Sequence, residues 1–220
     1  MVTVCWAAKG GSGTTVVAAT LALRAPHPSL LVDLDGELPS VLGIAEPDRP
    51  GVADWIASAA PAEHLADLTV RLDGTTELLP LRLGRDPEST DDSGNGDDRL
   101  TDLIAWLSAW ERSNDGTVVI DAGTGPLPSG LHTADRKLLV TRNCYLSVNR
   151  AAGFGPSPTG IVLIKEPGRS LGEHEIEHAV GAPIVAKLHW DTDVGRAVDA
   201  GLLAGRIPRS VDRELRRAAA

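Results

Sequence analysis

Residues 2–19 of the chain are VTVCWAAKGGSGTTVVAA. An apolar run with β-branched residues stops at a glycine-rich loop, and small and apolar residues at helical spacing follow, which predicts a strand, a tight loop and a helix. Successive backbone N–H groups of such a loop form an anion-binding concavity, to which the helix N-terminus adds the positive end of its dipole. Its glycines let the backbone approach an anion closely. The stretch therefore predicts a phosphate-binding loop.

The loop departs from the common phosphate-loop motif G-x-x-x-x-G-K-[ST] at two positions. Gly13 and Thr15 fit the motif, but Ala8 stands at its first glycine and Thr14 stands at its lysine. The lysine ammonium normally reaches the β- and γ-phosphates, whereas a threonine hydroxyl brings a hydrogen bond without a charge. On this evidence alone an ordinary glycine turn remains an alternative.

The segment KGGSGTT at residues 9–15 resembles the deviant Walker A motif K-G-G-x-G-K-[ST] of the ParA/MinD family of ATPases. Lys9 stands at that family's signature lysine, which reaches across a nucleotide-sandwich dimer to the partner's phosphates. Threonine in place of the second lysine resembles the TadZ/CpaE-like branch, whose members position pili. The resemblance implies ATP binding along the loop and assigns these residues to the nucleotide: Gly10, Gly11, Ser12, Gly13, Thr14 and Thr15.

Two acids follow the next apolar run, SLLVDLDG at residues 29–36. The run predicts a buried strand of a parallel sheet, and ligands of such sheets bind at the carboxyl ends of the strands. Asp33 and Asp35 should therefore lie on the same edge as the glycine loop, although acids after a strand can also do no more than cap a turn. The segment resembles the family's second strand, and the resemblance gives Asp35 a catalytic role beside Lys9, in positioning the attacking water or the metal shell.

The run TVVID at residues 117–121 has the form of a Walker B strand, because its final carboxylate emerges at the ligand edge. We expect Mg²⁺ to be held through Thr15 and Asp121, which are both hard oxygen ligands. The following residues, AGTGP, resemble the family's switch II, and this resemblance implies that the Gly125 N–H meets a γ-phosphate oxygen. Gly123 stands where the family has proline.

Length and composition place the chain among ordinary globular proteins. Its 220 residues, 42% hydrophobic and 23% charged, suit one α/β domain with a buried core. Cys5 and Cys144 lie in or at the end of apolar runs, which favours reduced core thiols and a cytoplasmic location over a disulfide or a metal pair. The absence of a long apolar stretch and of a basic leader predicts neither a transmembrane helix nor a signal peptide.

The net charge of −9 argues against non-specific DNA binding, which depends on basic contacts to phosphates. A cluster of arginines near the C-terminus is the one candidate for a local basic face, and a solvated helix end is the plainer interpretation; its members are Arg206, Arg209, Arg213, Arg216 and Arg217. The segment 210–220 has only Val211 and Leu215 as large apolar residues, so we expect no membrane insertion.

Four further features have a plain and a functional interpretation. Residues 85–99 hold five Asp and one Glu without apolar periodicity, which predicts an acidic mobile loop inserted before a helix over 100–110. The apolar stripe of that helix indicates core packing, with partner binding as the alternative. His174 and His178 share a helix face and indicate a solvated surface more than a metal site. Lys165 stands where the family has an adenine-reading Asn, so no base-reading residue is assigned.

The alternation of strands and helices predicts one doubly wound α/β domain over residues 1–220, with about seven mostly parallel strands and helices on both faces. The resemblance implies an ATP- and Mg²⁺-dependent homodimeric switch that positions cellular cargo, with hydrolysis slow or absent because Thr14 replaces the lysine. A pseudo-ATPase scaffold without nucleotide turnover is the alternative. A P-loop metabolic enzyme, such as a dethiobiotin-synthase-like ligase, is a third reading that lacks a second substrate motif.

Overall fold

The computed structural model describes residues 1–82 and 96–219. Within them, one eight-stranded sheet runs in the order β3-β4-β2-β5-β1-β6-β7-β8. Every neighbouring pair is parallel except β3 and β4, which are antiparallel. The strands are β1 Val2–Ala7, β2 Ser29–Asp33, β3 Val70–Arg71, β4 Thr76–Leu79, β5 Thr117–Thr124, β6 Arg136–Arg142, β7 Gly160–Lys165 and β8 Ile184–His189.

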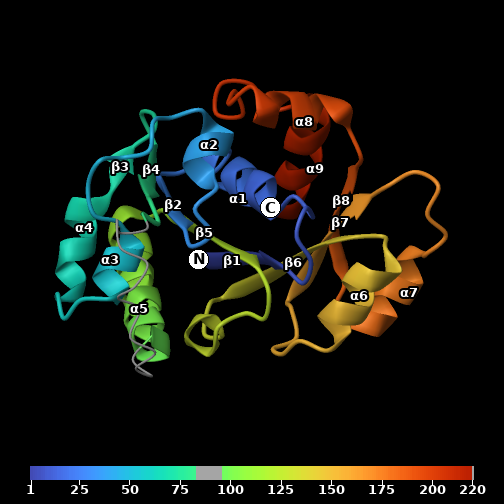
Figure 1. Cartoon of the computed structure of the whole chain (residues 1–220), viewed down its shortest axis with the longest axis horizontal. Helices are drawn as coiled ribbons and strands as arrows, with labels where there is room; N and C mark the ends of the chain where they lie inside the picture. The colour runs from blue at the N-terminus through green and yellow to red at the C-terminus, as the bar shows by residue number, and fades with distance from the viewer. Residues whose placement is uncertain (83–95, 220) are drawn as a thin grey trace.

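Helices cover both faces of the sheet (Figure 1). Helices α1, α2, α8 and α9 pack on one face, and α3, α4, α5, α6 and α7 pack on the other. Their bounds are α1 Thr14–Leu23, α2 Leu38–Leu42, α3 Val52–Ile56, α4 Leu65–Leu68, α5 Gly96–Asn114, α6 Tyr145–Ala152, α7 Glu173–Val180, α8 Thr192–Asp199 and α9 Arg209–Ala219, with 3₁₀ turns η1 Ala62–His64 and η3 Ser129–Leu131. The predicted doubly wound architecture is confirmed.

The central strands explain why the sequence signals of β1 and β2 are continuous rather than alternating. All six residues of β1 and all five of β2 are buried, because helices cover both sides of these parallel strands. β5 lies between them and pairs in parallel with both. The residues that follow these strands therefore meet at one edge of the sheet, and this places the glycine loop beside Asp33 and Asp121.

The described part of the sheet has one strand more than the expected seven. The extra strand is β3, a two-residue edge strand that pairs antiparallel with β4. Two residues cannot carry a period-2 hydrophobic pattern, and Val70 and Arg71 are only partly buried or exposed. Sequence periodicity therefore had no signal for it.

The predicted acidic loop at residues 85–99 is wrong at its end. Residues 83–95 lie outside the described residues, but Gly96–Arg99 already form the first turn of α5. Asp97 and Asp98 favour that position because acidic groups near a helix N-terminus interact well with its dipole. Asp97 also accepts a hydrogen bond from Ser129 of η3. Polar composition predicted a loop here, whereas the acids begin a helix.

Arg99 anchors this first turn to the α3 region. Its guanidinium lies 3.6 Å from the centroid of the Trp55 ring and donates to the carbonyls of Trp55 and Ala60 at 3.0 and 2.8 Å. Trp55 is itself buried in the core. Further along α5, Leu103 and Leu107 are buried in the core, so core packing of the apolar stripe is confirmed for them.

Candidate phosphate and metal site

The glycine loop is held in shape by its own backbone. Gly11 and Gly13 have φ values of +71° and +87°, a region that favours glycine. The Ser12 hydroxyl donates to the Lys9 carbonyl at 2.6 Å, and Gly13 is the N-cap of α1. Ser12 and Thr14 are buried, whereas Lys9 is half-buried at the mouth of the loop. The loop and the N-terminus of α1 thus form the preorganised arrangement that binds anions.

Asp33 acts mainly as a turn cap. Its carboxylate accepts N–H groups from Asp35 and Gly36 at 3.1 and 2.7 Å and from Leu38 at 3.3 Å. Burial nevertheless raises the pKa of Asp33, and these three N–H groups oppose the rise only in part. Of the two interpretations of the acids after β2, the structure supports capping for Asp33.

Asp35 is exposed and lies directly against Gly123 of β5. A Cβ atom at Gly123 would lie 2.1 Å from Asp35 Oδ1, and the φ of Gly123 is +63°. Proline, the family residue at this position, is fixed near a φ of about −65° and could not adopt this backbone. The departure from the family pattern at Gly123 therefore has a physical reason, which is the close approach of Asp35.

Asp121 is a buried carboxylate with a free oxygen. Its Oδ1 accepts the Gly123 N–H at 3.1 Å, while Oδ2 has no hydrogen-bond partner among the described residues. Burial raises the pKa of Asp121 to about 7; Thr15 and the Gly123 N–H oppose this rise, and the negative charges of Asp33 and Asp35 add to it. A cation bound beside this carboxylate would offset the cost of burying its charge.

The residues at this point fit a magnesium ion. A hydroxyl and a carboxylate are hard oxygen ligands, and Mg²⁺ in nucleotide sites keeps several waters and takes its other ligands from phosphates. Thr15 influences the pKa of Asp121, and Asp121 Oδ2 is unpartnered in the described structure. No group of three or more His, Cys, Asp or Glu residues suited to a metal occurs in the described part of the chain. The arrangement therefore suits a metal that arrives with phosphates, not a cage built from protein ligands alone.

The expected switch II segment begins as strand. β5 continues through Thr124, which pairs with Ala7 after a register shift, and the Gly125 N–H donates to the Ala7 carbonyl at 2.9 Å. The N–H that the resemblance assigns to a γ-phosphate is thus engaged in this structure. A phosphate contact would require Gly125 to exchange this partner.

A pocket of about 460 Å³ adjoins the glycine loop. Its walls come from the loop, α1, the ends of β7 and β8, and α8, and they include Gly11, Val16, Ile164, Leu188, Trp190 and Val194. Trp190 is half-exposed at the end of β8. Apolar walls beside a phosphate loop suit a planar base. Sequence analysis missed Trp190, and its one signal was its place directly after a predicted strand.

Lys165 does not line this pocket. Its ammonium lies 3.2 Å from Glu173, which also binds Lys187 at 2.7 Å. Lys165 therefore does not take over the base-reading role of the family Asn in this arrangement.

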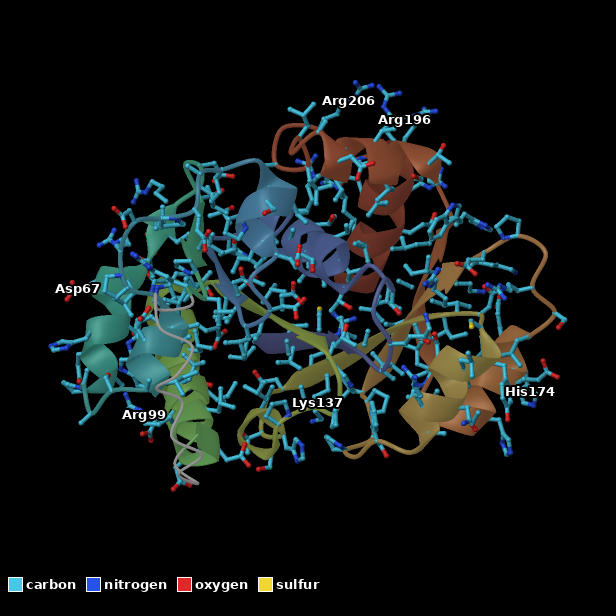
Figure 2. The ribbon with its side chains drawn as sticks, in the orientation of Figure 1. Asp67, Arg99, Lys137, His174, Arg196 and Arg206 are labelled. Atoms are coloured by element: carbon cyan, nitrogen blue, oxygen red, sulfur yellow. The ribbon has the colours of Figure 1, made fainter. Side chains whose placement is uncertain are left out.

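A second cavity, of about 740 Å³, lies between α8 and the segment that leads to α9. It shares only Asp191 and Arg196 with the pocket beside the loop. Figure 2 shows Arg196 and Arg206 on the outer side of the molecule, beyond these helices. Because no residue of the glycine loop lines it, this larger cavity is not the phosphate site.

Two members of the C-terminal arginine cluster are held in ion pairs. Arg213 pairs with Glu214 at 2.9 Å, and Arg216 pairs with Asp212 at 2.9 Å. Val211 and Leu215 of α9 are buried against the sheet. The apolar face of α9 is thus used within the fold. In the described part of the chain, no helix is long and apolar enough to cross a membrane.

Two minor expectations can also be placed. Cys5 and Cys144 are both free, but only Cys5 is a core residue, since Cys144 is half-buried at the N-cap of α6. His174 lies on the outer side of α7 (Figure 2), in agreement with a solvated helix face.

Neither a family model nor a curated protein matches the sequence. The fold, in contrast, matches solved structures along nearly the whole chain. A ParA family ATPase from Chlorobium tepidum superposes with a TM-score of 0.73 at 21% identity, covering 99% of this chain and 96% of that one. Pyrococcus horikoshii MinD, complexed with Mg-ADP, superposes with a TM-score of 0.71 at 20% identity, covering 100% of this chain and 95% of that one. A Cyanothece McdA variant complexed with ATP superposes with a TM-score of 0.66 at 17% identity, covering 99% of this chain and 95% of that one.

These similarities establish that the chain has the α/β fold of the ParA and MinD ATPases. At such identities they show the fold, and the activity must be argued from the residues of the site.

Proposed function

We propose that this protein binds ATP with Mg²⁺ and acts as a ParA/MinD-like, nucleotide-dependent dimeric switch that positions cellular cargo. The observation that carries the proposal is the buried, unpartnered Oδ2 of Asp121 beside Thr15, at the mouth of a preformed glycine loop. A phosphate loop, a hard oxygen ligand for the metal and an adjoining apolar pocket are the three parts that a nucleotide site needs.

Each part has an assigned role in the proposal. The loop from Gly10 to Thr15 holds the phosphates through its N–H groups and the α1 dipole. Thr15 and Asp121 hold Mg²⁺, which neutralises phosphate charge when bound. The pocket at Trp190 receives the base. The complexes of MinD with Mg-ADP and of McdA with ATP support this assignment, since both proteins share the fold.

Turnover should be slow. Transfer of a phosphoryl group needs positive charge in the transition state, and Thr14 supplies none where the common motif has lysine. We assign Lys9 to the partner subunit's phosphates in a homodimer and Asp35 to the attacking water. Lys9 is half-buried at the mouth of the loop, and Asp35 is exposed at the same edge.

The branch of the family and the compartment are also part of the proposal. Threonine at position 14 supports a TadZ/CpaE-like protein that attends pili or secretion machinery. The free thiols of Cys5 and Cys144 support the reducing cytoplasm.

A pseudo-ATPase scaffold is the second candidate, and one observation favours it. The Gly125 N–H already bonds Ala7, and this bond would have to break before a γ-phosphate could be contacted. Nucleotide-independent dimerisation would support the scaffold; dimerisation that requires ATP would support the switch.

DNA binding should be weak at physiological salt, because the chain carries a net charge of −9 and Arg213 and Arg216 are paired. Retardation of a non-specific duplex at about 0.15 M salt that is lost on Arg213→Ala would contradict this statement and favour a partition function.

An equilibrium titration with a fluorescent ATP analogue, with Mg²⁺ or with EDTA, tests the main proposal. Binding should require Mg²⁺, and Asp121→Ala should abolish the Mg²⁺-dependent part of the affinity. Asp73→Ala, at an exposed turn far from the loop in sequence, is the matched control and should change nothing. Unchanged affinity in Asp121→Ala would show that the metal assignment is wrong.

A further inference from the structure

Arg142 brings a positive charge to the glycine loop from a strand that sequence analysis did not connect with it. It is the last residue of β6, the strand that pairs with β1 on the side away from β5. A Cβ atom at Gly11 would lie 3.3 Å from Arg142 Nη2. The guanidinium therefore packs directly against the loop.

The position of Arg142 is fixed by a support built around Glu166. Arg142 Nη1 donates to Glu166 Oε1, and Arg169 Nε donates to Glu166 Oε2 at 2.9 Å. Asn143 binds the Glu166 backbone on both sides, donating to its carbonyl at 3.2 Å and accepting its N–H at 2.8 Å. Although burial opposes it, the two arginines hold the pKa of Glu166 below its usual range, so Glu166 stays charged at neutral pH.

The donors of Arg142 are not all used by this support. Two arginines share one carboxylate, which leaves one positive charge in excess. Arg142 Nε is buried without a hydrogen-bond partner among the described residues, and Nη2 is the atom that faces Gly11. The Trp190 ring, a wall of the adjoining pocket, lies 5.8 Å from the guanidinium. Arg142 thus stands where the loop and the pocket meet.

The loop itself lacks the lysine of the common motif. Thr14 stands at the lysine position, and the carboxylates of Asp33, Asp35 and Asp121 lie at the same edge of the sheet. A polyphosphate that enters this edge needs positive charge besides Mg²⁺. Arginine suits the task because its planar fork can bind a carboxylate through one edge and face an anion with its other donors.

We propose that Arg142, positioned by Glu166, is the in-cis cation of the nucleotide site and binds the phosphate chain in place of the missing lysine. This inference rests on the proposed function, since it takes ATP and ADP as the ligands. Arg142 approaches from β6, not from the first turn of α1, so it should act on the phosphates of ATP and ADP alike. It should therefore contribute affinity more than turnover.

The test measures binding of MgATP, MgADP and adenosine to the full chain and to four variants. Removing a hydrogen bond to a charged group typically costs about 1.5 to 3 kcal/mol, so Arg142→Ala should lower the affinity for MgATP and for MgADP by roughly tenfold to hundredfold. Adenosine, which carries no phosphate, should bind unchanged. Arg142→Lys should retain part of the affinity, because it keeps the charge and loses the fork.

Arg169→Ala is the matched control. Arg169 pairs with the same carboxylate and is half-exposed, so its loss disturbs the support without removing the donor that faces Gly11. It should change MgATP affinity by less than about threefold, which is below the cost of a charged hydrogen bond. The double variant Thr14→Lys with Arg142→Ala should recover affinity for MgATP, since the lysine restores a cation. Recovery in this variant would also show that Arg142→Ala lowers affinity by removing a charge and not by unfolding the chain.

The outcomes separate this inference from the proposed function. A wild-type chain that binds neither MgATP nor MgADP refutes both. Wild-type binding that survives Arg142→Ala unchanged, or a loss that affects adenosine as strongly as ATP, overturns the role of Arg142 and leaves the nucleotide site intact.

Discussion

Replacing Asp121 by Asn should stabilise the fold at neutral and alkaline pH while destroying the metal site. Asp121 is buried with one unpartnered oxygen, and its pKa rises from the ordinary 3.8 to about 7. Because the folded pKa lies above the unfolded value, the native state binds more protons between these pH values. The stability of the wild-type protein should therefore fall as the pH rises from about 4 to about 7 and stay low above it.

The size of the effect follows from the pKa shift. A rise from 3.8 to about 7 is roughly 3 units, and at about 1.4 kcal/mol per unit it corresponds to an upper limit of about 4 kcal/mol. Asn keeps an oxygen to accept the Gly123 N–H, and its amide can face the carboxylates of Asp33 and Asp35. We therefore expect Asp121→Asn to raise the free energy of unfolding by up to that amount at pH 8 and to change it little at pH 4.

Urea denaturation at pH 4, 6 and 8, without nucleotide or Mg²⁺, measures the free energy of unfolding of the wild type and of Asp121→Asn. Asp73→Asn is a control of opposite sign, because N–H bonds from Thr75 and Thr76 lower the pKa of Asp73 although slight burial opposes them. Its contribution is present above about pH 4 and lost at lower pH, so the variant should be less stable at pH 8. A wild-type stability that is flat from pH 4 to 8, or an Asp121→Asn variant that is less stable than the wild type at pH 8, would show that burying the Asp121 carboxylate does not cost stability.

Three further predictions concern the loop and its edge. Lys9→Ala should lose the ATP-induced dimer in light scattering while the monomer still binds ATP; a dimer that persists contradicts the assignment of Lys9 to the partner's phosphates. Thr14→Lys should raise the hydrolysis rate about a hundredfold, since one transition-state donor is worth on the order of 3 kcal/mol, and an unchanged phosphate-release rate would show that another group already supplies the charge. In Gly123→Ala, the new Cβ atom would sit on a backbone with a φ of +63° and lie 2.1 Å from Asp35 Oδ1. The substitution should therefore lower the free energy of unfolding, measured by urea denaturation, by about 1 to 3 kcal/mol. An unchanged urea midpoint would mean that Asp35 moves aside freely.

The sequence was most informative where the backbone itself makes the site. The glycine loop and the two acid-terminated strands could be placed because buried parallel strands are continuous apolar runs, and their order fixes which ends lie on one edge. Composition wrongly predicted a loop at Gly96–Arg99, because acidic residues occur both in loops and in the first turn of helices. The packing of Arg99 on Trp55, which holds this turn, cannot be read from composition.

Contacts between elements distant in the chain could not be predicted. Arg142 touches the loop only because β6 lies next to β1, and Trp190 reaches the pocket only because β8 ends at the same edge. Neither residue stands in a motif. The bond from the Gly125 N–H to Ala7 likewise depends on a register shift between β1 and β5, which no sequence pattern specifies.

Crystals of the protein grown with ATP, and with Mn²⁺ in place of Mg²⁺, would test the assignment of the nucleotide and metal site, because anomalous scattering locates the metal. We expect phosphates along the glycine loop, a metal peak between Thr15 and Asp121 Oδ2, and the base in the pocket beside Trp190. A nucleotide in the cavity between α8 and α9, or a bound nucleotide without metal at Asp121, would contradict this assignment.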